Sequence, residues 1–439
     1  MATNARAEEA RHSVPFLRWV PVGVGLGCII MLAFNLRPGV VSTGPVLQEV
    51  QNDLALTPTL VSVLTTLPVL CFGVVGAVTP WLEGRIGLRN LTVLASSLIA
   101  VGLLARSAVP GALSFLGLSA VAFAGMAIGN VALPSLVNVH FASRVGPVTS
   151  IYTTVLAGGI LAASALTVPV ATLAGSWRWG LALWGAVACV GLYPVGRLLR
   201  RAQHPWAAVR RAHLHAPHAG REQSDAGPVS RSGPTFGAVA RTRLGWVMAV
   251  FFGLQSVQAF AGFGWLAQIY RDAGFSASAA GMLLGVVTAT VVPLSLLMPL
   301  VVARAGHPGA LVCGLSLLYP VAYLGLVAAP VSGAWLWAVL LGAASALFPV
   351  SLLLIGLKAR TEEGTAALSG FTQSVGYLLS VVGPFGVGLL HAATGAWTLP
   401  LYALAALALP QCATGLYLAR PVTIEDVVAA EPTPHERRP

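Results

Sequence analysis

The chain has 439 residues, of which 56% are hydrophobic and only 9% are charged. A soluble domain carries charges on about 25% of its residues, so this composition excludes a soluble globular fold and indicates a polytopic protein of the lipid bilayer. The net charge of +11 would also suit nucleic acid, but the basic residues gather in loops between apolar runs, where they set the topology. We therefore expect no nucleic-acid partner.

Neither cysteines nor histidines form a pattern typical of a metal centre or a disulfide framework. The five cysteines stand singly in apolar stretches, without a Cys-x-x-Cys pair, as small packing residues do. The histidines of the central polar stretch indicate a solvated basic loop rather than a zinc site. We expect no metal and no other cofactor. Because no catalytic cluster stands out, we also expect no enzyme activity.

Apolar runs of membrane-spanning length recur along the whole chain, and each can cross a hydrocarbon core of about 30 Å as a helix. The first run follows charged residues, as in a signal peptide. Its polar interruptions and the many later runs indicate a transmembrane helix instead. We predict an all-α protein with twelve transmembrane helices, at 20–46, 58–81, 90–108, 112–137, 147–172, 178–199, 244–269, 278–302, 309–329, 334–357, 365–391 and 396–419.

Arg37 stands near the middle of the first span, in the run Phe-Asn-Leu-Arg-Pro-Gly at 34–39. An arginine at this depth costs about 3 kcal/mol on insertion scales, so it normally faces a protein interior or an aqueous cavity. Its guanidinium can bind an anionic or electron-rich group. The alternative is a structural arginine that bonds a carbonyl exposed by the break at Pro38. Asn35 is a further candidate, although it faces elsewhere on a regular helix.

The second and third spans are joined by a loop that is repeated later in the chain. Proline, arginine and glycine stand in one register at 80–87 and again at 299–306, each after the second helix of a six-helix set. Two copies in register favour a cytoplasmic gate over plain turn chemistry. The halves then form parallel repeats, the arrangement of the major facilitator fold, with a substrate site between them. The predicted gating residues are Arg85, Gly87, Arg304 and Gly306.

Neutral polar residues recur on single helix faces in later spans, although each alone more often joins helices than binds a ligand. Gln255 and Gln258 stand at i and i+3 in span 7, followed by Trp265. Gln373 and Tyr377 share a face in span 11. Such groups can orient a planar polar solute. Our predicted solute-binding residues are Arg37, Asn35, Asn130, Tyr152, Gln255, Gln258, Trp265, Gln373 and Tyr377.

A polar stretch rich in arginine, histidine, proline and glycine divides the spans into two sets of six and predicts an unstructured linker. We predict an N-terminal six-helix bundle at 1–199, a cytoplasmic linker at 200–243, a C-terminal six-helix bundle at 244–420 and a cytoplasmic tail at 421–439.

Basic residues orient these bundles. With a cytoplasmic N-terminus, all but four of the 25 basic residues lie on the inner side. We therefore place both termini in the cytoplasm and the protein in the cell membrane. The four exceptions are Arg37, Arg178, Arg271 and Arg106, the last of which we expect to be an interfacial residue at the outer end of span 3.

Several stretches resemble known transporter families. The loop at 80–89 resembles a degenerate facilitator loop motif, in which Arg85, Gly87 and Arg89 match while Gly84 replaces the motif's aspartate. Most of the chain is similar to the cyanate/2-nitroimidazole transporter (CynX/NimT-like) family. The stretches that carry this similarity lie at 35–38 (Asn-Leu-Arg-Pro), 64–73, 129–136, 253–256, 265–266, 369–377 and 383–384.

This resemblance implies a secondary transporter that moves a cyanate-like anion or a nitroimidazole-like heterocycle by alternating access. No aspartate or glutamate lies deep in a predicted span, which disfavours the alternative of a multidrug efflux pump for cations. A transport-like sensor without flux is a further alternative. We expect a monomer that binds a small-molecule solute, with a proton as the candidate coupling ion.

Overall fold

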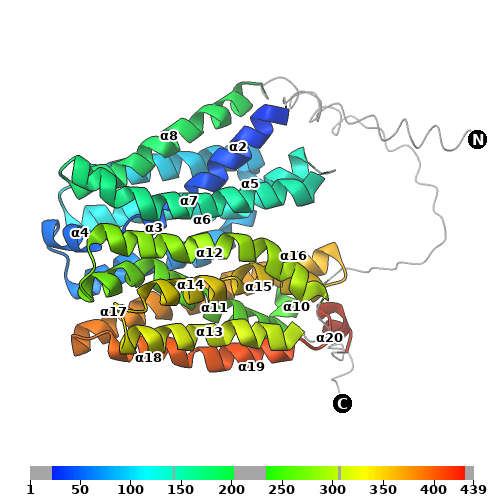
Figure 1. Cartoon of the computed structure of the whole chain (residues 1–439). Helices are drawn as coiled ribbons and strands as arrows, with labels where there is room; N and C mark the ends of the chain where they lie inside the picture. Colours follow the sequence, from blue (N-terminus) through cyan, green and yellow to red (C-terminus); the bar gives the residue numbers. More distant parts are fainter. Residues whose placement is uncertain (1–21, 142–143, 202–233, 305–307, 431–439) are drawn as a thin grey trace, which may run out of the picture.

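The computed structural model describes residues 22–141, 144–201, 234–304 and 308–430. Within these residues the chain is helical and contains no strand, which confirms the all-α prediction. The helices lie side by side in two groups (Figure 1), with α2 to α8 in the upper half of the view and α11 to α19 in the lower half. The two groups correspond to the two predicted sets of spans.

The first group begins with a broken helix in place of the single span predicted at 20–46. Its next helix, α5, is 51 residues long, about 76 Å at 1.5 Å per residue, and therefore crosses a bilayer twice. The two crossings meet at Gly87, whose φ of 79° and ψ of 153° suit only glycine. The elements are α2 (Val22–Asn35), α3 (Pro38–Val41), η2 (Gly44–Val46), α4 (Leu47–Asp53), α5 (Pro58–Ala108), α6 (Ala112–His140), α7 (Val145–Leu173) and α8 (Trp177–Arg201).

The last three spans of the second group are each broken four residues before a proline. Pro349, Pro384 and Pro410 lack an amide hydrogen, and their rings crowd the carbonyl one turn earlier, where the preceding helix ends. The elements are α11 (Arg243–Asp272), α12 (Ala277–Arg304), α13 (Pro308–Ala328), α14 (Ala334–Ser345), α15 (Leu347–Leu357), α16 (Glu362–Ser380), α17 (Val382–Thr394), α18 (Thr398–Ala406) and α19 (Ala408–Leu418).

Ten helical segments of the described residues are long and apolar enough to cross a membrane. One of them is α5, which makes two crossings. The 25-residue α8 is not among the ten, but it packs beside α2, α5 and α7. With α5 counted twice and α8 included, the segments correspond to the twelve predicted crossings.

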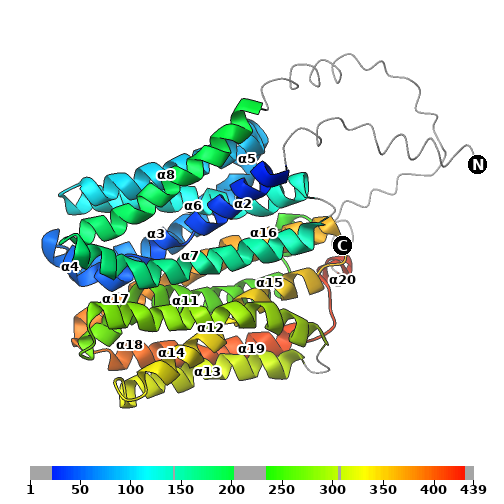
Figure 2. The same ribbon diagram turned by 45° about the horizontal axis from the view of Figure 1, so that its top comes forward.

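Two short helices, α10 (Phe236–Val239) and α20 (Ile424–Ala430), lie together at one end of the molecule (Figures 1 and 2). Burial of the Glu425 carboxylate in α20 opposes its ionisation. The hydrogen bonds that it accepts from the backbone N–H groups of Arg360 and Thr361 outweigh this effect and lower the pKa of Glu425. Most of the predicted linker and the last nine residues of the predicted tail lie outside the described residues, so the boundaries of both stay predictions.

The two groups meet along pairs of helices that are far apart in sequence. α7 contacts α12, while α5 contacts α16 and α17, and α7 and α12 run beside each other in both views (Figures 1 and 2). The break in the first span lies close to this interface, because α3 and η2 contact α11. The fold thus brings the residues of the break to the contact between the halves.

Candidate functional site

Arg37 lies in the break between α2 and α3. Its backbone has φ −122° and ψ −32°, outside the helical range, and Pro38 begins the next helix. α7 approaches the break closely, because a Cβ atom added to Gly159 would lie 2.5 Å from the Phe34 carbonyl oxygen. The break and the glycine together place Arg37 inside the protein instead of in lipid.

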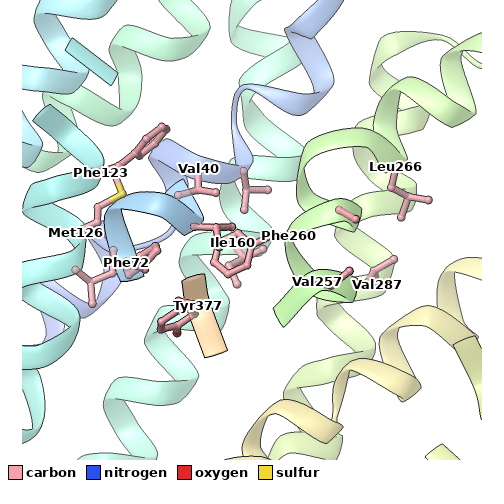
Figure 3. Packing of buried hydrophobic residues seen from close by; sticks show 14 of the residues in the cluster. Val40, Phe72, Phe123, Met126, Ile160, Val257, Phe260, Leu266, Val287 and Tyr377 are labelled. Atoms are coloured by element: carbon pink, nitrogen blue, oxygen red, sulfur yellow. The ribbon is translucent and has the colours of Figure 1, made fainter. Parts of the chain in front are cut away.

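The Arg37 side chain is surrounded by aromatic rings from both halves. It is only 6% exposed, and its Cζ lies 5.1 Å from the centre of the Phe72 ring. Tyr377 of α16 faces the guanidinium from the opposite half. The Phe72 ring centre lies 5.6 Å from that of Tyr377 and 6.0 Å from that of Phe260, and Figure 3 shows these three rings close together. We call Arg37, Phe72, Phe260 and Tyr377 the central cluster.

Arg37 has no carboxylate partner in the part of the chain that the structure describes. The ion pairs found there join Arg178 to Asp53, Arg271 to Glu49 and Arg360 to Asp426. Nη1 of Arg37 is buried and makes no hydrogen bond with any described residue. A buried donor of this kind is costly unless something binds to it, so the central cluster contains a free, positively charged donor.

Arg106 has the structural role that the sequence left open for Arg37. Its Nη2 donates to the Gly39 carbonyl at 3.0 Å, next to the break. The side chain is fully buried, with Cζ 5.9 Å and 5.8 Å from the ring centres of Phe115 and Phe123. The expectation of an interfacial Arg106 is therefore wrong. The side chain turns inward because the break supplies an acceptor and neighbouring helices supply aromatic faces.

A small cavity lies beside the central cluster, between the halves. Residues of the first span, α5, α6 and α11 line it, including Val40, Thr43 and Phe260. The Thr43 hydroxyl is buried and has no hydrogen-bond partner among the described residues. Thr43, Phe72 and Phe260 were not among the predicted solute-binding residues. Phe72 could have been found from the sequence, because it lies in the stretch 64–73 that resembles the transporter family.

The two glutamines of span 7 bond to other helices of their own half. Gln255 donates to the Tyr319 hydroxyl at 3.0 Å and accepts from Gln411 at 2.9 Å. Gln258 donates to the Leu404 carbonyl at 3.0 Å and accepts from the Tyr323 hydroxyl at 2.8 Å. Both side chains are buried. The structure therefore does not bring these amides together with Arg37.

Trp265 and Asn35 also point away from the central cluster. The indole N–H of Trp265 donates to the Pro384 carbonyl at 2.9 Å, which joins α11 to the break between α16 and α17. Nδ2 of Asn35 donates to the Met31 carbonyl at 2.8 Å. Asn35 lines a small cavity inside the first half, beside Gly191. The first contact joins two helices of the second half, and the second lies within α2.

Three further predicted residues lie on faces that lead toward the central cluster. Gln373 precedes Tyr377 by one helical turn and donates to the Ser369 hydroxyl at 2.7 Å. Tyr152 precedes Gly159 by two turns, so both share the face of α7 that meets the break. Asn130 follows, by one turn, Met126, which contacts Gly39. All three are half-buried.

Across the interface, one end of the molecule is closed by an ion pair between the halves. Arg271 at the end of α11 donates to both carboxylate oxygens of Glu49 in α4, at 2.7 Å and 2.9 Å, and to the Pro45 carbonyl at 3.2 Å. A Cβ added to Gly44 would lie 2.8 Å from the Phe263 carbonyl oxygen. This end carries α4 and lies opposite α10 and α20 (Figure 1).

Three of the four predicted gating residues lie at the end that carries α10 and α20, and the structure describes them in part. Arg85 is exposed, with its Cζ 4.0 Å from the centre of the Trp81 ring. Gly87 forms the turn between the two crossings of α5. Arg304 ends α12, and only its backbone is described. Gly306 lies outside the described residues, so the gating role stays a prediction.

Known proteins resemble this chain in sequence and in fold. The sequence matches the Major Facilitator Superfamily over residues 24–384. It is 31% identical over 393 residues to the 2-nitroimidazole transporter of Escherichia coli (strain K12), with 89% of this chain and 94% of that protein covered. It is 26% identical over 369 residues to the cyanate transport protein CynX of the same organism, with 84% and 90% covered. The crystal structure of the D-xylose-proton symporter shares the fold, with a TM-score of 0.67 and 13% identity over 93% of this chain and 98% of that one.

Proposed function

The chain belongs to the Major Facilitator Superfamily, and we propose that it carries a small anionic or polar solute by alternating access of its two halves. The predicted resemblance and the predicted twelve-helix facilitator fold are both confirmed. The protein is a multi-pass membrane transporter, and its family and relatives are transporters and not enzymes. The proposed cargo is a cyanate-like anion or a nitroimidazole-like heterocycle, because two relatives are named for these solutes.

One observation carries the proposal. Arg37 is buried between the halves, and its Nη1 has no hydrogen-bond partner among the described residues. A negative or electron-rich group placed there would satisfy the donor, at a depth where low dielectric strengthens the interaction. Because Tyr377 contacts Arg37 from the other half, a solute bound at Nη1 beside this contact would touch both halves. It could then favour one arrangement of the halves over another.

The aromatic rings of the central cluster favour a flat solute. Phe72, Phe260 and Tyr377 offer apolar faces, and the Tyr377 hydroxyl adds a second polar group opposite Arg37. Gln373, one turn away on the same face, is the proposed next contact. The unpaired positive charge would repel the lipophilic cations that a multidrug efflux pump accepts, which makes that alternative less consistent with the site.

We propose that both termini are cytoplasmic. The inner side then carries α10, α20 and the basic loops, in agreement with the distribution of arginines. The Arg271–Glu49 pair lies on the outer side and closes it, so the described conformation corresponds to a carrier sealed from outside. Arg85 and Gly87, with Arg304 and Gly306, are the proposed inner gate. A monomer and a coupling proton stay predictions.

Solute counterflow in proteoliposomes tests the proposal without assuming a direction of transport. Vesicles preloaded with unlabelled 2-nitroimidazole, or with cyanate, should take up the labelled solute. We expect Arg37→Ala to lower the rate by about 30-fold or more, since truncating one partner of a buried charged contact costs about 2–5 kcal/mol. Arg37→Lys should retain part of the rate, because it keeps the charge but loses the planar fork.

Asn35→Ala is the matched control, because Asn35 ends α2 beside the break but faces the interior of its own half. It should keep counterflow near the wild-type rate. Small anions should compete with the labelled solute, while lipophilic cations should not. Wild-type counterflow by Arg37→Ala, at equal protein levels, would remove Arg37 from the mechanism. Competition by cations alone would favour the efflux pump.

A further inference from the structure

Two arginines pack against one tyrosine in the second half. The site lies at the end of the molecule that carries α10 and α20. Arg243 begins α11 and Arg420 follows α19, and their Cζ atoms lie 5.1 Å and 5.4 Å from the centre of the Tyr417 ring. Both arginines are exposed, and neither is in an ion pair with a described residue. Stacking on the ring restricts both side chains and leaves their charge unneutralised. The result is a preformed site for an anion.

An apolar groove runs along the face of α11 that Arg243 begins. It has a volume of about 410 Å³, lies between α17 and the α18–α19 pair, and is lined by hydrophobic residues and glycines alone. Val250, Leu254 and Val257 belong to its lining. They follow Arg243 by 7, 11 and 14 residues, which places them on one helix face. Val250 is therefore about 10 Å from Arg243 along the helix axis.

We propose that this surface binds an anionic phospholipid. The phosphate lies between Arg243 and Arg420, and one acyl chain lies in the groove over α11. The charge of the two arginines is complementary to an anionic headgroup, and the groove lacks any polar lining group that a protein partner or a polar solute would need. The arginines lie at the helix ends, and the groove lies deeper in the membrane along the same face. A lipid has its headgroup and its acyl chain in this same order.

The site is separate from the central cluster, and the proposal does not depend on the identity of the transported solute. The lipid site is linked to the transport machinery by α11. The same helix contains Phe260 of the central cluster and Arg271 of the outer ion pair. A bound lipid would join the ends of α11 and α19 in the conformation described. It would therefore stabilise the protein by mass action.

Thermal unfolding in detergent micelles tests the headgroup preference. Phosphatidylglycerol should raise the Tm by about 2 °C or more over phosphatidylcholine with the same acyl chains. The double variant R243Q/R420Q should lose this difference. The matched control R89Q/R144Q removes two other arginines from the first half and should keep it. Equal shifts with both lipids in the wild type would overturn the proposal, as would a preference that persists in R243Q/R420Q or disappears in the control.

A groove variant tests where the chain lies. Gly386 lines the groove, and a Cβ added there would meet no atom within 4 Å, so Gly386→Phe places a ring in the groove from a position that has room for a side chain. It should lower the number of phosphatidylglycerol molecules retained in native mass spectrometry to the level of R243Q/R420Q. Wild-type retention in Gly386→Phe would exclude the groove. If R243Q/R420Q does not fold, R243K/R420K replaces it and should keep the preference for the anionic lipid, because lysine retains the charge.

Discussion

Two sets of buried polar groups, the glutamines of α11 in the second half and Arg37 in the first, differ in how far their hydrogen bonds are satisfied. In the second half, Gln255 and Gln258 have partners at both ends of their amides, on helices of that same half. In the first half, Arg37 reaches the interface with a nitrogen that has no hydrogen-bond partner among the described residues. Satisfied groups hold helices together in an apolar environment, whereas an unsatisfied one is available to a ligand. A polar residue within a span therefore indicates function only when its partners are known.

A second comparison is between two arginines that meet at the break, Arg37 within it and Arg106 from α5. Arg106 donates to the Gly39 carbonyl that the break leaves available, and two phenylalanine rings surround it. Arg37 has an aromatic neighbour but no such acceptor for Nη1. The first arginine completes the fold of the broken span. Both arginines keep buried nitrogens without a partner among the described residues, Nη1 in Arg37 and Nε and Nη1 in Arg106, but Arg106 alone of the two bonds to the broken segment, and substitutions should separate these roles.

The largest effect on stability is expected from Arg106→Ala. The substitution leaves the Gly39 carbonyl without its Arg106 donor and opens a cavity beside the Phe115 and Phe123 rings, so the free energy of unfolding should fall by about 2–4 kcal/mol. Chemical denaturation in detergent, followed by tryptophan fluorescence, measures this change. A variant as stable as the wild type would show that Arg106 does not support the break.

A somewhat smaller loss is expected from Gln258→Leu. The Tyr323 hydroxyl and the Leu404 carbonyl each lose a bond, which should cost about 2 kcal/mol while solute binding stays unchanged. Gln268→Leu on the same helix is the control, because Gln268 is only half-buried and bonds to the exposed Asp272. If Gln258→Leu weakened solute binding without loss of stability, the second half would hold part of the binding site.

Arg37→Leu should change stability in the opposite direction. Removal of an unpaired buried charge in favour of an apolar side chain should stabilise the unliganded protein, by about 1 kcal/mol, while solute binding is lost. Denaturation with and without solute measures both effects. A destabilised variant would mean that Arg37 has a structural role like that of Arg106.

The smallest effect concerns the ion pair between the halves. Arg271→Ala should weaken the outer closure by about 0.5–1 kcal/mol, because Glu49 is partly exposed, and so increase access from outside about two- to fivefold. Labelling of Thr43→Cys by a membrane-impermeant maleimide, in a background without the native cysteines, measures this access. Thr43 lines the cavity between the halves.

Arg178→Ala is the matched control for that experiment. Its partner Asp53 belongs to the same half, so its loss should leave the labelling rate unchanged. Equal increases in both variants would attribute the effect to general loosening of the outer end. No increase in Arg271→Ala would show that the Arg271–Glu49 pair does not keep the carrier closed.

Several features of the fold could be predicted from the sequence because they depend on local chemistry. Hydrophobic length located the spans, since each must match the thickness of a bilayer. Pro38 marked the break in the first span, and three later prolines each end a helix four residues before them. Arg37 could also be identified from the sequence, because an isolated charge at mid-depth is costly whichever direction its helix faces.

The direction in which each polar side chain points was decided by the tertiary structure alone. Gln255, Gln258 and Trp265 share a helix with Phe260, yet only Phe260 reaches the central cluster, because neighbouring helices supply partners for the other three. The Arg271–Glu49 pair joins residues 222 positions apart. Helical periodicity determines the angle between two side chains on one helix, but which face meets which neighbour depends on how the helices pack. That packing is absent from any single stretch of the sequence.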